Sequence, residues 1–527
     1  MASFSASSAL LLALCALGPA SAASQAVSPY TMPGDPLVDY ARLLQLADSV
    51  PADPWSAARE VRASRLGKAP GLRFELLPAE LRGAWNSRRP WGTNDGAIWQ
   101  GRGATAAFTA GAAFRWGPLS GALHPTVIRN ENRGFGLSPL AVPPGLGPWS
   151  YPSGIGQTLD MPQRFGDGLF DTFDLGQSFV RAEIGPLAVG LSNENRWWGP
   201  GRQNAITMTN NAPGFGHAFL ETRRPLDLGI VTVEGEWVWG SLRESRHFDS
   251  NVENDRRFFT GITGRLSPKG MKDLELGFTR HFSLYWPAGG PSSDELLMVF
   301  IPMEKVDLIT PENPTGDDAA DQMASIFFRW KFPRSRTELY GEWGRGDHSR
   351  DLRDLLLEPE HASAWLVGLQ RAFRVQDQKL WRLSAEFLTL GSARTSSLRA
   401  PASAFYVHHI VKQGYTQRGQ VMGAGIGPGS SQLWLAVDRF APWGKVGAAF
   451  MRTAYDNNRF LAQPRSFTAL EVEPSFALDA LVFRGPLDIQ AGATFSRLLN
   501  KWYVEGNDET NVNVSIGARY HFGPGVR

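Results

Sequence analysis

The chain has 527 residues and a formal net charge of only +2, which gives no electrostatic case for binding nucleic acid. Its 56 glycines and 36 prolines interrupt the chain too often for a protein built of long helices. No run of 18 or more apolar residues follows the N-terminal segment, so the sequence predicts no transmembrane helix.

The N-terminus has the pattern of a secretory signal. A short apolar run spans residues 10–17, and the small residues Ala20, Ser21 and Ala22 follow it, which predicts cleavage after Ala22. The only cysteine, Cys15, lies inside this run. We therefore expect an exported mature protein without disulfides and without a cysteine metal site.

Three short helices are expected next. Asp35 followed by Pro36 is typical of a helix start, and residues 37–47 place apolar side chains on one face. Asp53 followed by Pro54 repeats the start signal, and a third short helix is expected over Pro78–Trp85. Helices of this length are not stable alone, so they are expected to pack on another part of the chain.

From about residue 104 onward the sequence predicts strands and turns. Residues 512–522 alternate strictly between apolar and polar side chains, over the length that a tilted strand needs to cross a bilayer, about 9–11 residues. Residues 231–239, 337–343 and 487–496 alternate in the same way. Glu234, Glu236 and similar carboxylates on the polar faces favour a water-filled lumen, although a soluble β-sandwich with solvent-exposed carboxylates fits the same pattern.

The connections support an up-and-down barrel. Gly-Pro-Leu recurs at residues 117–119, 185–187 and 485–487, each time between two strand-like runs, as expected for tight periplasmic turns. Longer polar or Gly/Pro-rich stretches at 130–174, 286–321, 347–359 and 457–464 are expected to be extracellular or lumen-folding loops. The predicted domains are a signal peptide (1–22), an N-terminal helical periplasmic region (23–100) and an all-β outer-membrane β-barrel (101–527).

The densest group of candidate binding residues lies within residues 193–204. Asn195, Arg196, Trp197, Trp198 and Arg202 combine amide, guanidinium and flat aromatic groups, which suit the hydroxyls and the apolar face of a sugar ring. The structural alternative is that the Trp-Trp-Gly-Pro-Gly turn anchors the membrane interface, or that the Arg and Asn side chains cross-link a loop to the barrel wall.

A second candidate group contains Tyr415 and Arg418. The adjacent His408 and His409 would face opposite sides of a strand, so a shared metal is disfavoured, and the glycine-rich run at 423–429 lacks the pattern of a nucleotide site. The catalytic motifs of zinc proteases and of α/β-hydrolases are absent from the sequence. No catalytic residue, metal or cofactor is therefore predicted, although a site built from scattered residues stays open.

These blocks resemble the capsule-assembly Wzi family of outer-membrane proteins. The resemblance rests on residues 184–201 (I-G-P-L-A-V-G-L-S-N-E-N-R-W-W-G-P-G), 161–168 (M-P-Q-R-F-G-D-G) and 411–419 (V-K-Q-G-Y-T-Q-R-G), with the Gly-Pro-Gly-Ser at 427–430, and extends from about residue 36 to residue 522. It implies an 18-stranded barrel with a helical bundle at its periplasmic end. It also implies an outer-membrane lectin, not an enzyme, that holds capsular polysaccharide at the cell surface. A five-residue tail after Phe522 departs from the usual aromatic end of such barrels.

The sequence thus predicts a protein of the outer membrane that binds and anchors capsular or other exopolysaccharide. Its expected partners are this polysaccharide, outer-membrane lipids and polysaccharide export machinery. The alternatives are a saccharide-permeable porin and a barrel hydrolase acting on lipid or glycan.

Overall fold

The computed structural model describes residues 32, 35–47, 71–140, 142–151, 158–271, 273–302, 320–346, 351–375, 379–391, 405–462 and 467–522. The predicted signal peptide and the second predicted helix, after Asp53, lie outside these residues. No helix among the described residues has both the length and the apolar character needed to cross a membrane.

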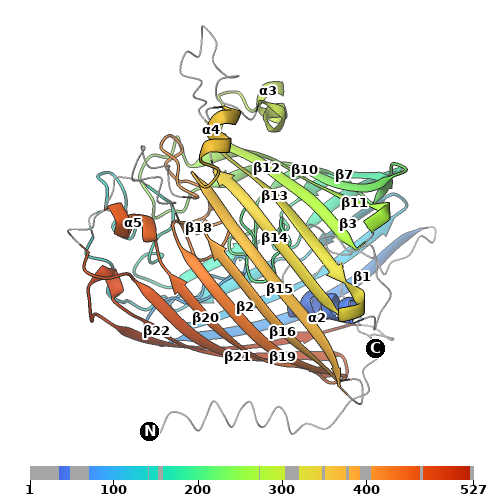
Figure 1. Ribbon diagram of the computed structural model, residues 1–527. Coiled ribbons are helices and arrows are strands. Elements are labelled where there is room, and N and C mark those ends of the chain that lie inside the picture. The colour runs from blue at the N-terminus through green and yellow to red at the C-terminus, as the bar shows by residue number, and fades with distance from the viewer. Residues whose placement is uncertain are drawn as a thin grey trace.

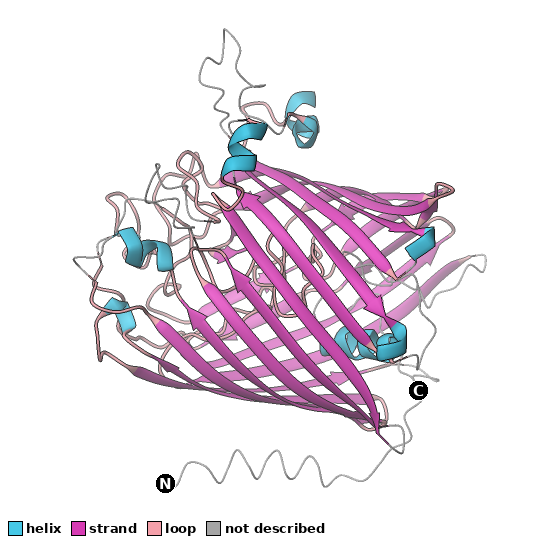
Figure 2. Cartoon of the chain, viewed as in Figure 1, coloured by secondary structure: helices cyan, strands magenta, loops and turns pink. Residues whose placement is uncertain are grey.

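The described chain forms one large antiparallel sheet that closes on itself (Figures 1 and 2). The first strand pairs with the second and also with the last, which removes both free edges. In chain order the strands are β1 (Leu72–Asn86), β2 (Gly103–Trp116), β3 (Leu119–Leu123), β4 (Thr126–Asn130), β5 (Phe170–Asp174), β6 (Phe179–Ile184), β7 (Leu187–Ser192), β8 (His217–Thr222), β9 (Leu226–Asp227), β10 (Val231–Arg243), β11 (Arg256–Pro268), β12 (Leu274–Tyr285), β13 (Asp321–Phe332), β14 (Thr337–Gly346), β15 (Ser363–Val375), β16 (Lys379–Thr389), β19 (Ser431–Ala441), β20 (Gly444–Ala454), β21 (Val472–Arg484), β22 (Leu487–Leu498) and β23 (Glu509–Tyr520).

Three positions in the barrel wall are each shared by two short strands. β3 and β4 both pair with β2, β5 and β6 pair with β4 and β3 respectively, and β8 and β9 both pair with β10. The 21 strands of the sheet therefore fill 18 positions around the wall, which confirms the predicted all-β transmembrane barrel of about 18 strands.

The predicted alternation holds along the wall. In β23 the exposed Ile516 and Tyr520 point outward, and the buried Asn513 and Arg519 point into the lumen. Large exposed apolar side chains recur on the outward face of most strands, for example Phe74, Leu191 and Ile326. Such an outer apolar band is what a barrel in a lipid bilayer requires.

The two ends of the barrel differ. Adjacent strands join through tight turns at one end and through long loops at the other (Figure 1). The three Gly-Pro-Leu turns all lie at the short-turn end, where Gly117, Gly185 and Gly485 have φ of 55°, 59° and 62°. Glycine enters this left-handed region at little cost, which explains why the same residue recurs there.

The helices of the described chain are all short. They are α2 (Pro36–Leu46), α3 (Ser293–Leu297), α4 (Leu352–Leu357), α5 (Asn457–Ala462) and the 3₁₀ turns η1 (Lys269–Met271), η2 (Met298–Phe300), η4 (Pro333–Ser335) and η6 (Lys501–Tyr503). The predicted start of α2 is confirmed, since the Asp35 side chain accepts a 2.9 Å hydrogen bond from the Leu37 amide and Pro36 begins the helix. α2 lies within the barrel at the short-turn end, not below it.

The predicted third helix is wrong, because residues 78–85 belong to β1. The barrel wall begins at Leu72, so the expected boundary near residue 101 falls inside it. Pro78 indicated a helix start, but it lies where the register between β1 and β2 shifts, an irregularity that tolerates a residue without an amide hydrogen. Pairing with β2 and β23 then outweighs the local helical preference.

The largest hydrophobic core among the described residues lies inside the lumen and contains side chains from both loops and wall. Loop residues such as Trp198, Met208, Tyr406 and Tyr415 pack on wall residues such as Phe259. Among the described residues, inward carboxylates that were expected to face water instead bond to loop side chains, as Glu236 does to Trp198.

Candidate functional site

Three segments that fill the lumen are here called the plug: α2, residues 193–216 and residues 405–430. The second segment leads into β8 and contains the Trp-Trp-Gly-Pro-Gly block, and the third joins β16 to β19 and contains the small hairpin of β17 (Thr416–Gln417) and β18 (Gln420–Val421). The two predicted candidate groups thus lie together in one structure, although they are some 200 residues apart in the sequence.

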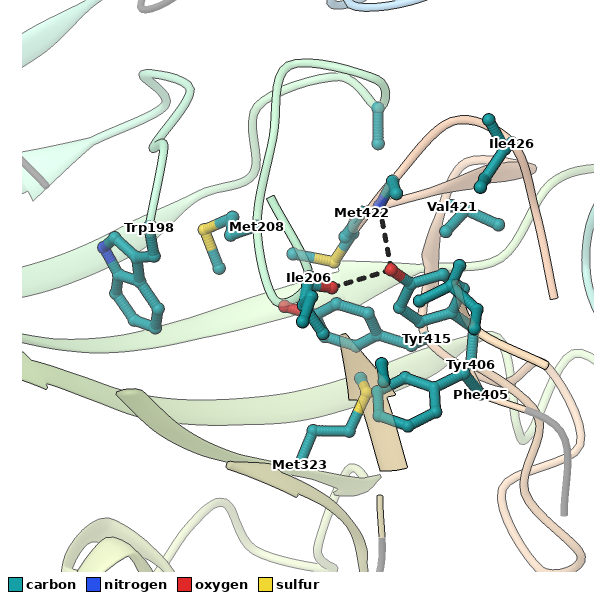
Figure 3. Close-up of a cluster of buried hydrophobic side chains, with 14 of the residues drawn as sticks. Trp198, Ile206, Met208, Met323, Phe405, Tyr406, Tyr415, Val421, Met422 and Ile426 are labelled. Carbon is teal, nitrogen blue, oxygen red and sulfur yellow. Dashed lines mark hydrogen bonds between the residues drawn. The ribbon is translucent and has the colours of Figure 1, made fainter. Parts of the chain in front are cut away.

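Backbone hydrogen bonds join the second and third segments. The Thr209 amide donates to the Met422 carbonyl at 2.8 Å, and the Thr209 hydroxyl donates to the Gly423 carbonyl at 2.6 Å. The Tyr406 hydroxyl donates to the Ile206 carbonyl at 2.7 Å and accepts from the Ala424 amide at 2.9 Å (Figure 3). These bonds satisfy loop backbone that water cannot reach.

Trp198 anchors the second segment to the wall. Its side chain has no exposed surface, and its indole nitrogen donates a 3.1 Å hydrogen bond to Glu236 of β10. The ring lies over Gly261 of β11, where an added Cβ would stand 2.8 Å from it. A glycine in the wall therefore makes the space for this tryptophan.

Asn195 and Arg196 are also held by the protein. The Asn195 side chain donates to the Ala212 carbonyl at 2.8 Å and accepts from Gln177 at 3.0 Å. Arg196 pairs with Glu236 at 3.0 Å, and its guanidinium carbon lies 5.2 Å from the centre of the Phe219 ring.

The turn at residues 201–204 is held by hydrogen bonds to one carboxylate of the barrel wall. Glu386 of β16 accepts hydrogen bonds from the backbone amides of Arg202, Gln203 and Asn204 at 2.8, 3.2 and 2.8 Å. The same carboxylate accepts from the Tyr340 hydroxyl at 2.9 Å and is almost wholly buried. Such a nest of donors stabilises a buried negative charge.

Arg202 links the second segment to α2. Its guanidinium donates twice to the Asp39 carboxylate, both at 2.9 Å, and once to Ser384 at 2.6 Å. Burial alone would raise the pKa of Asp39, but Arg202 and Arg382 hold that pKa well below its usual range. A second link between α2 and this segment is Arg42, which donates to Glu338 of β14 and, at 2.9 Å, to the carbonyl of Pro200, two residues before Arg202.

Tyr415 and Arg418 have different surroundings. Tyr415 is fully buried and stacks on the ring of His281, with ring centres 4.3 Å apart. Arg418 keeps 37% of its side chain exposed and pairs with Asp174 of β5 at 2.8 Å. Trp197 is also partly exposed.

The predicted site residues therefore fall into two sets. Trp197 and Arg418 keep part of their side-chain surface exposed. The other residues are largely occupied by the plug and the wall, as the cross-linking alternative expects; they are Asn195, Arg196, Trp198, Arg202 and Tyr415. The membrane-interface alternative is wrong, because Trp198 lies inside the lumen.

Sequence reasoning missed the wall residues that hold the plug. Glu386 holds the first group, and the fully buried Arg257 of β11 donates to the Gly414 and Thr416 carbonyls at 2.5 and 2.9 Å. Both lie on the polar face of an alternating strand. No alternation was predicted for these two strands, and nothing local indicates which loop their side chains bind.

The loop between β10 and β11 gathers three carboxylates. The oxygens of Glu244, Asp249 and Asp255 lie within 4.8 Å of one another, a grouping that sequence reasoning did not predict. Gln413 of the plug donates to Glu244 at 2.6 Å. Burial and the neighbouring carboxylates raise the pKa of Glu244 to about 7.

Comparison with known proteins gives one family and one fold. The family model described as capsule assembly protein Wzi matches residues 82–513. No curated protein sequence matches the chain. The chain is similar in fold to Wzi of Escherichia coli, described as an outer membrane protein involved in group 1 capsule assembly and a carbohydrate-binding β-barrel, with 13% identity, 84% of each chain covered and a TM-score of 0.55.

Two further solved structures resemble the chain less. OpdQ of Pseudomonas aeruginosa has 9% identity and a TM-score of 0.39, and covers 85% of this chain and 98% of its own. A BenF-like porin of Pseudomonas fluorescens has 10% identity and a TM-score of 0.41, and covers 85% and 99%.

Proposed function

Since the chain belongs to the capsule assembly protein Wzi family and is an outer-membrane β-barrel, we propose that it binds capsular or other exopolysaccharide and anchors it at the cell surface. Binding is non-covalent and without turnover. The long loops face outward and the short turns face the periplasm, as in other outer-membrane barrels.

The observation that carries this proposal is the plug. A hydrophobic core of the chain's own side chains occupies the lumen, and the buried ion pair of Arg202 with Asp39 ties a loop segment to α2. A filled lumen gives a rigid base for an outer binding surface and opposes free passage of saccharides. This favours a binding protein over the porin alternative.

Within this proposal the candidate residues have two roles. Trp197 supplies stacking area and Arg418 supplies directional hydrogen bonds to the polysaccharide, because both have exposed surface. The buried residues Trp198, Arg202 and Tyr415 act indirectly, by holding in place the segments that carry Trp197 and Arg418. Asn195 and Arg196 share this supporting role.

The direct test uses the purified barrel and surface polysaccharide extracted from the source strain. Saturable binding with unchanged polymer length is expected. Shortened products would support the hydrolase alternative, and absence of binding by a correctly folded barrel would refute the proposal.

Planar-bilayer conductance tests the porin alternative separately. The plugged barrel is expected to conduct poorly. Large, steady conductance steps that are reduced by added oligosaccharide would instead establish a saccharide-permeable pore.

A further inference from the structure

A second candidate site lies on the outer face of the barrel. A groove of about 750 Å³ runs beside the short strands β6, β7 and β8, and its lining includes outward-facing apolar side chains. Val180, Leu191 and Trp239 contribute from β6, β7 and β10, and Leu296 contributes from α3.

The groove arises from a step in the wall. β7 and β8 have six residues each, whereas the neighbouring β10 and β11 have 13. The loop after β12 folds over the outer face of the longer strands, where Trp239 donates a 3.1 Å hydrogen bond to the Leu296 carbonyl. The recess between the short strands and this loop faces the lipid.

Two arginines stand at the long-loop end of the groove. Arg243 ends β10 and Arg256 begins β11, and the two are paired in register, so their side chains lie next to each other on the outer face. Arg256 lines the groove, donates to the Ser241 hydroxyl at 2.8 Å and lies 3.3 Å from the centre of the Trp286 ring.

Neither arginine forms an ion pair with a carboxylate among the described residues. The nearest acidic residues along the chain, Glu244 and Asp255, follow the strand alternation to the opposite side, where Glu244 accepts from the plug residue Gln413. Like charges placed directly opposite on neighbouring strands are destabilising unless an anion lies between them. The charge on this outer face is thus complementary to a negative head group.

We propose that this groove binds a phosphorylated lipid of the outer leaflet, of the lipid A class. An acyl chain lies in the apolar recess, and a phosphate accepts hydrogen bonds from Arg243 and Arg256. The arginines lie at the long-loop end, so the head group lies at the outer surface of the membrane. Arginine suits this role because its planar fork binds phosphate oxygens in pairs.

Native mass spectrometry of the delipidated, detergent-solubilised full barrel tests the proposal, with purified diphosphorylated lipid A as the probe and phosphatidylcholine as the zwitterionic comparison. Lipid A is expected to bind one per barrel and to withstand competition by phosphatidylcholine. The double variant Arg243→Gln with Arg256→Gln is expected to bind lipid A roughly tenfold or more weakly, since each charge-assisted hydrogen bond to phosphate contributes substantially to the binding free energy.

Two further variants separate the parts of the site. Arg439→Gln removes an outward-facing arginine that also lies over a tryptophan ring, Trp381, but at the short-turn end, and is expected to bind normally. Ala218→Phe fills the recess and is expected to weaken binding without changing either arginine. Equal binding of both lipids, equal loss in Arg439→Gln, or full binding by the double arginine variant would overturn the proposal.

Discussion

Arg202 grips both carboxylate oxygens of Asp39 at 2.9 Å, and this one ion pair joins the Trp-Trp-Gly-Pro-Gly segment to the N-terminal helix across 163 residues of chain. Asp39 also accepts from Arg382 of β16, so helix, loop and wall meet at one carboxylate. Arg202, which the sequence predicted to bind sugar, therefore has a structural role: it holds the plug segments together.

The first prediction concerns this pair. Arg202→Lys keeps the charge but loses the planar fork, so it should weaken the bond between α2 and the second plug segment by about 1.5–3 kcal/mol. We expect faster hydrogen exchange in α2 and in residues 199–204, with a barrel that still migrates as a heat-modifiable species. The matched control is Arg129→Lys, because Arg129 makes a similar two-point bond to Asp171 on the exposed surface.

The Arg129–Asp171 pair should contribute little to stability, since solvent screens the interaction of exposed charges. Exchange in α2 that is unchanged in Arg202→Lys would show that Arg382 alone secures the helix.

A second prediction tests the space under Trp198. Gly261→Val places a side chain where even a Cβ would stand 2.8 Å from the indole, so Trp198 must move. Overpacking of this kind costs about 1–3 kcal/mol. The displaced ring should shift the tryptophan fluorescence emission and raise bilayer conductance.

Gly517→Ala is the control for the glycine change. It also lies on a wall strand, but its nearest neighbour, the Gln490 Cβ, is an ordinary 3.6 Å from an added Cβ. Equal effects from both variants would mean that the space over Gly261 has no special role.

The third prediction separates binding from support. Trp197→Ala and Arg418→Ala should lower cell-bound polysaccharide while surface abundance of the barrel stays normal, because both side chains are partly exposed. Arg418→Ala leaves the buried Asp174 without its ion pair, so Arg418→Gln serves as the milder comparison. Cell-bound polysaccharide and surface-labelled protein are measured on the same cells.

Trp198→Ala should behave differently, since its side chain is fully buried against the wall. Removing it should cost about 3–5 kcal/mol and reduce barrel yield together with polysaccharide retention. Normal retention in a Trp197→Ala, Arg418→Gln double variant would place the binding surface elsewhere on the long loops.

The fourth prediction is a pH dependence at the contact between the β10–β11 loop and the plug. In the folded protein, burial raises the pKa of Glu244 from its usual 4.5 to about 7 and that of Asp160 from 3.8 to about 6. The folded state then holds these protons more tightly than the unfolded state does. Their stabilising effect is complete below about pH 4 and is lost as the pH rises through 6 and 7.

A spin label at Lys412→Cys should therefore become more mobile between pH 5 and pH 8. Glu244→Gln should remove most of this change, because the amide stays neutral at both values. Glu253→Gln, in the same loop but exposed, is the control. A pH response that is the same in all three proteins would exclude Glu244 as its cause.

The sequence by itself determined the wall. The alternation of residues 512–522 reflects the two-residue period of a strand, and the glycine at position 185 reflects the sterics of a tight turn. Both signals are local, so nearby residues are enough to read them. The start of α2 was also readable, because Asp35 and Pro36 act on the first turn alone. Pro78 led to a wrong helix prediction, because a proline can also lie at an irregularity in a strand, and that depends on how the neighbouring strands pair.

Only the tertiary structure decided what fills the lumen and which face the candidate residues present. Trp198 packs over Gly261 and donates a hydrogen bond to Glu236. Arg202 pairs with Asp39, which is 163 residues away in the sequence. No local pattern records such pairings, because the contacts form only after the barrel closes and brings distant loops into one enclosed, water-poor space. The same closure turned inward carboxylates, expected to face water, into partners for buried arginines and loop amides.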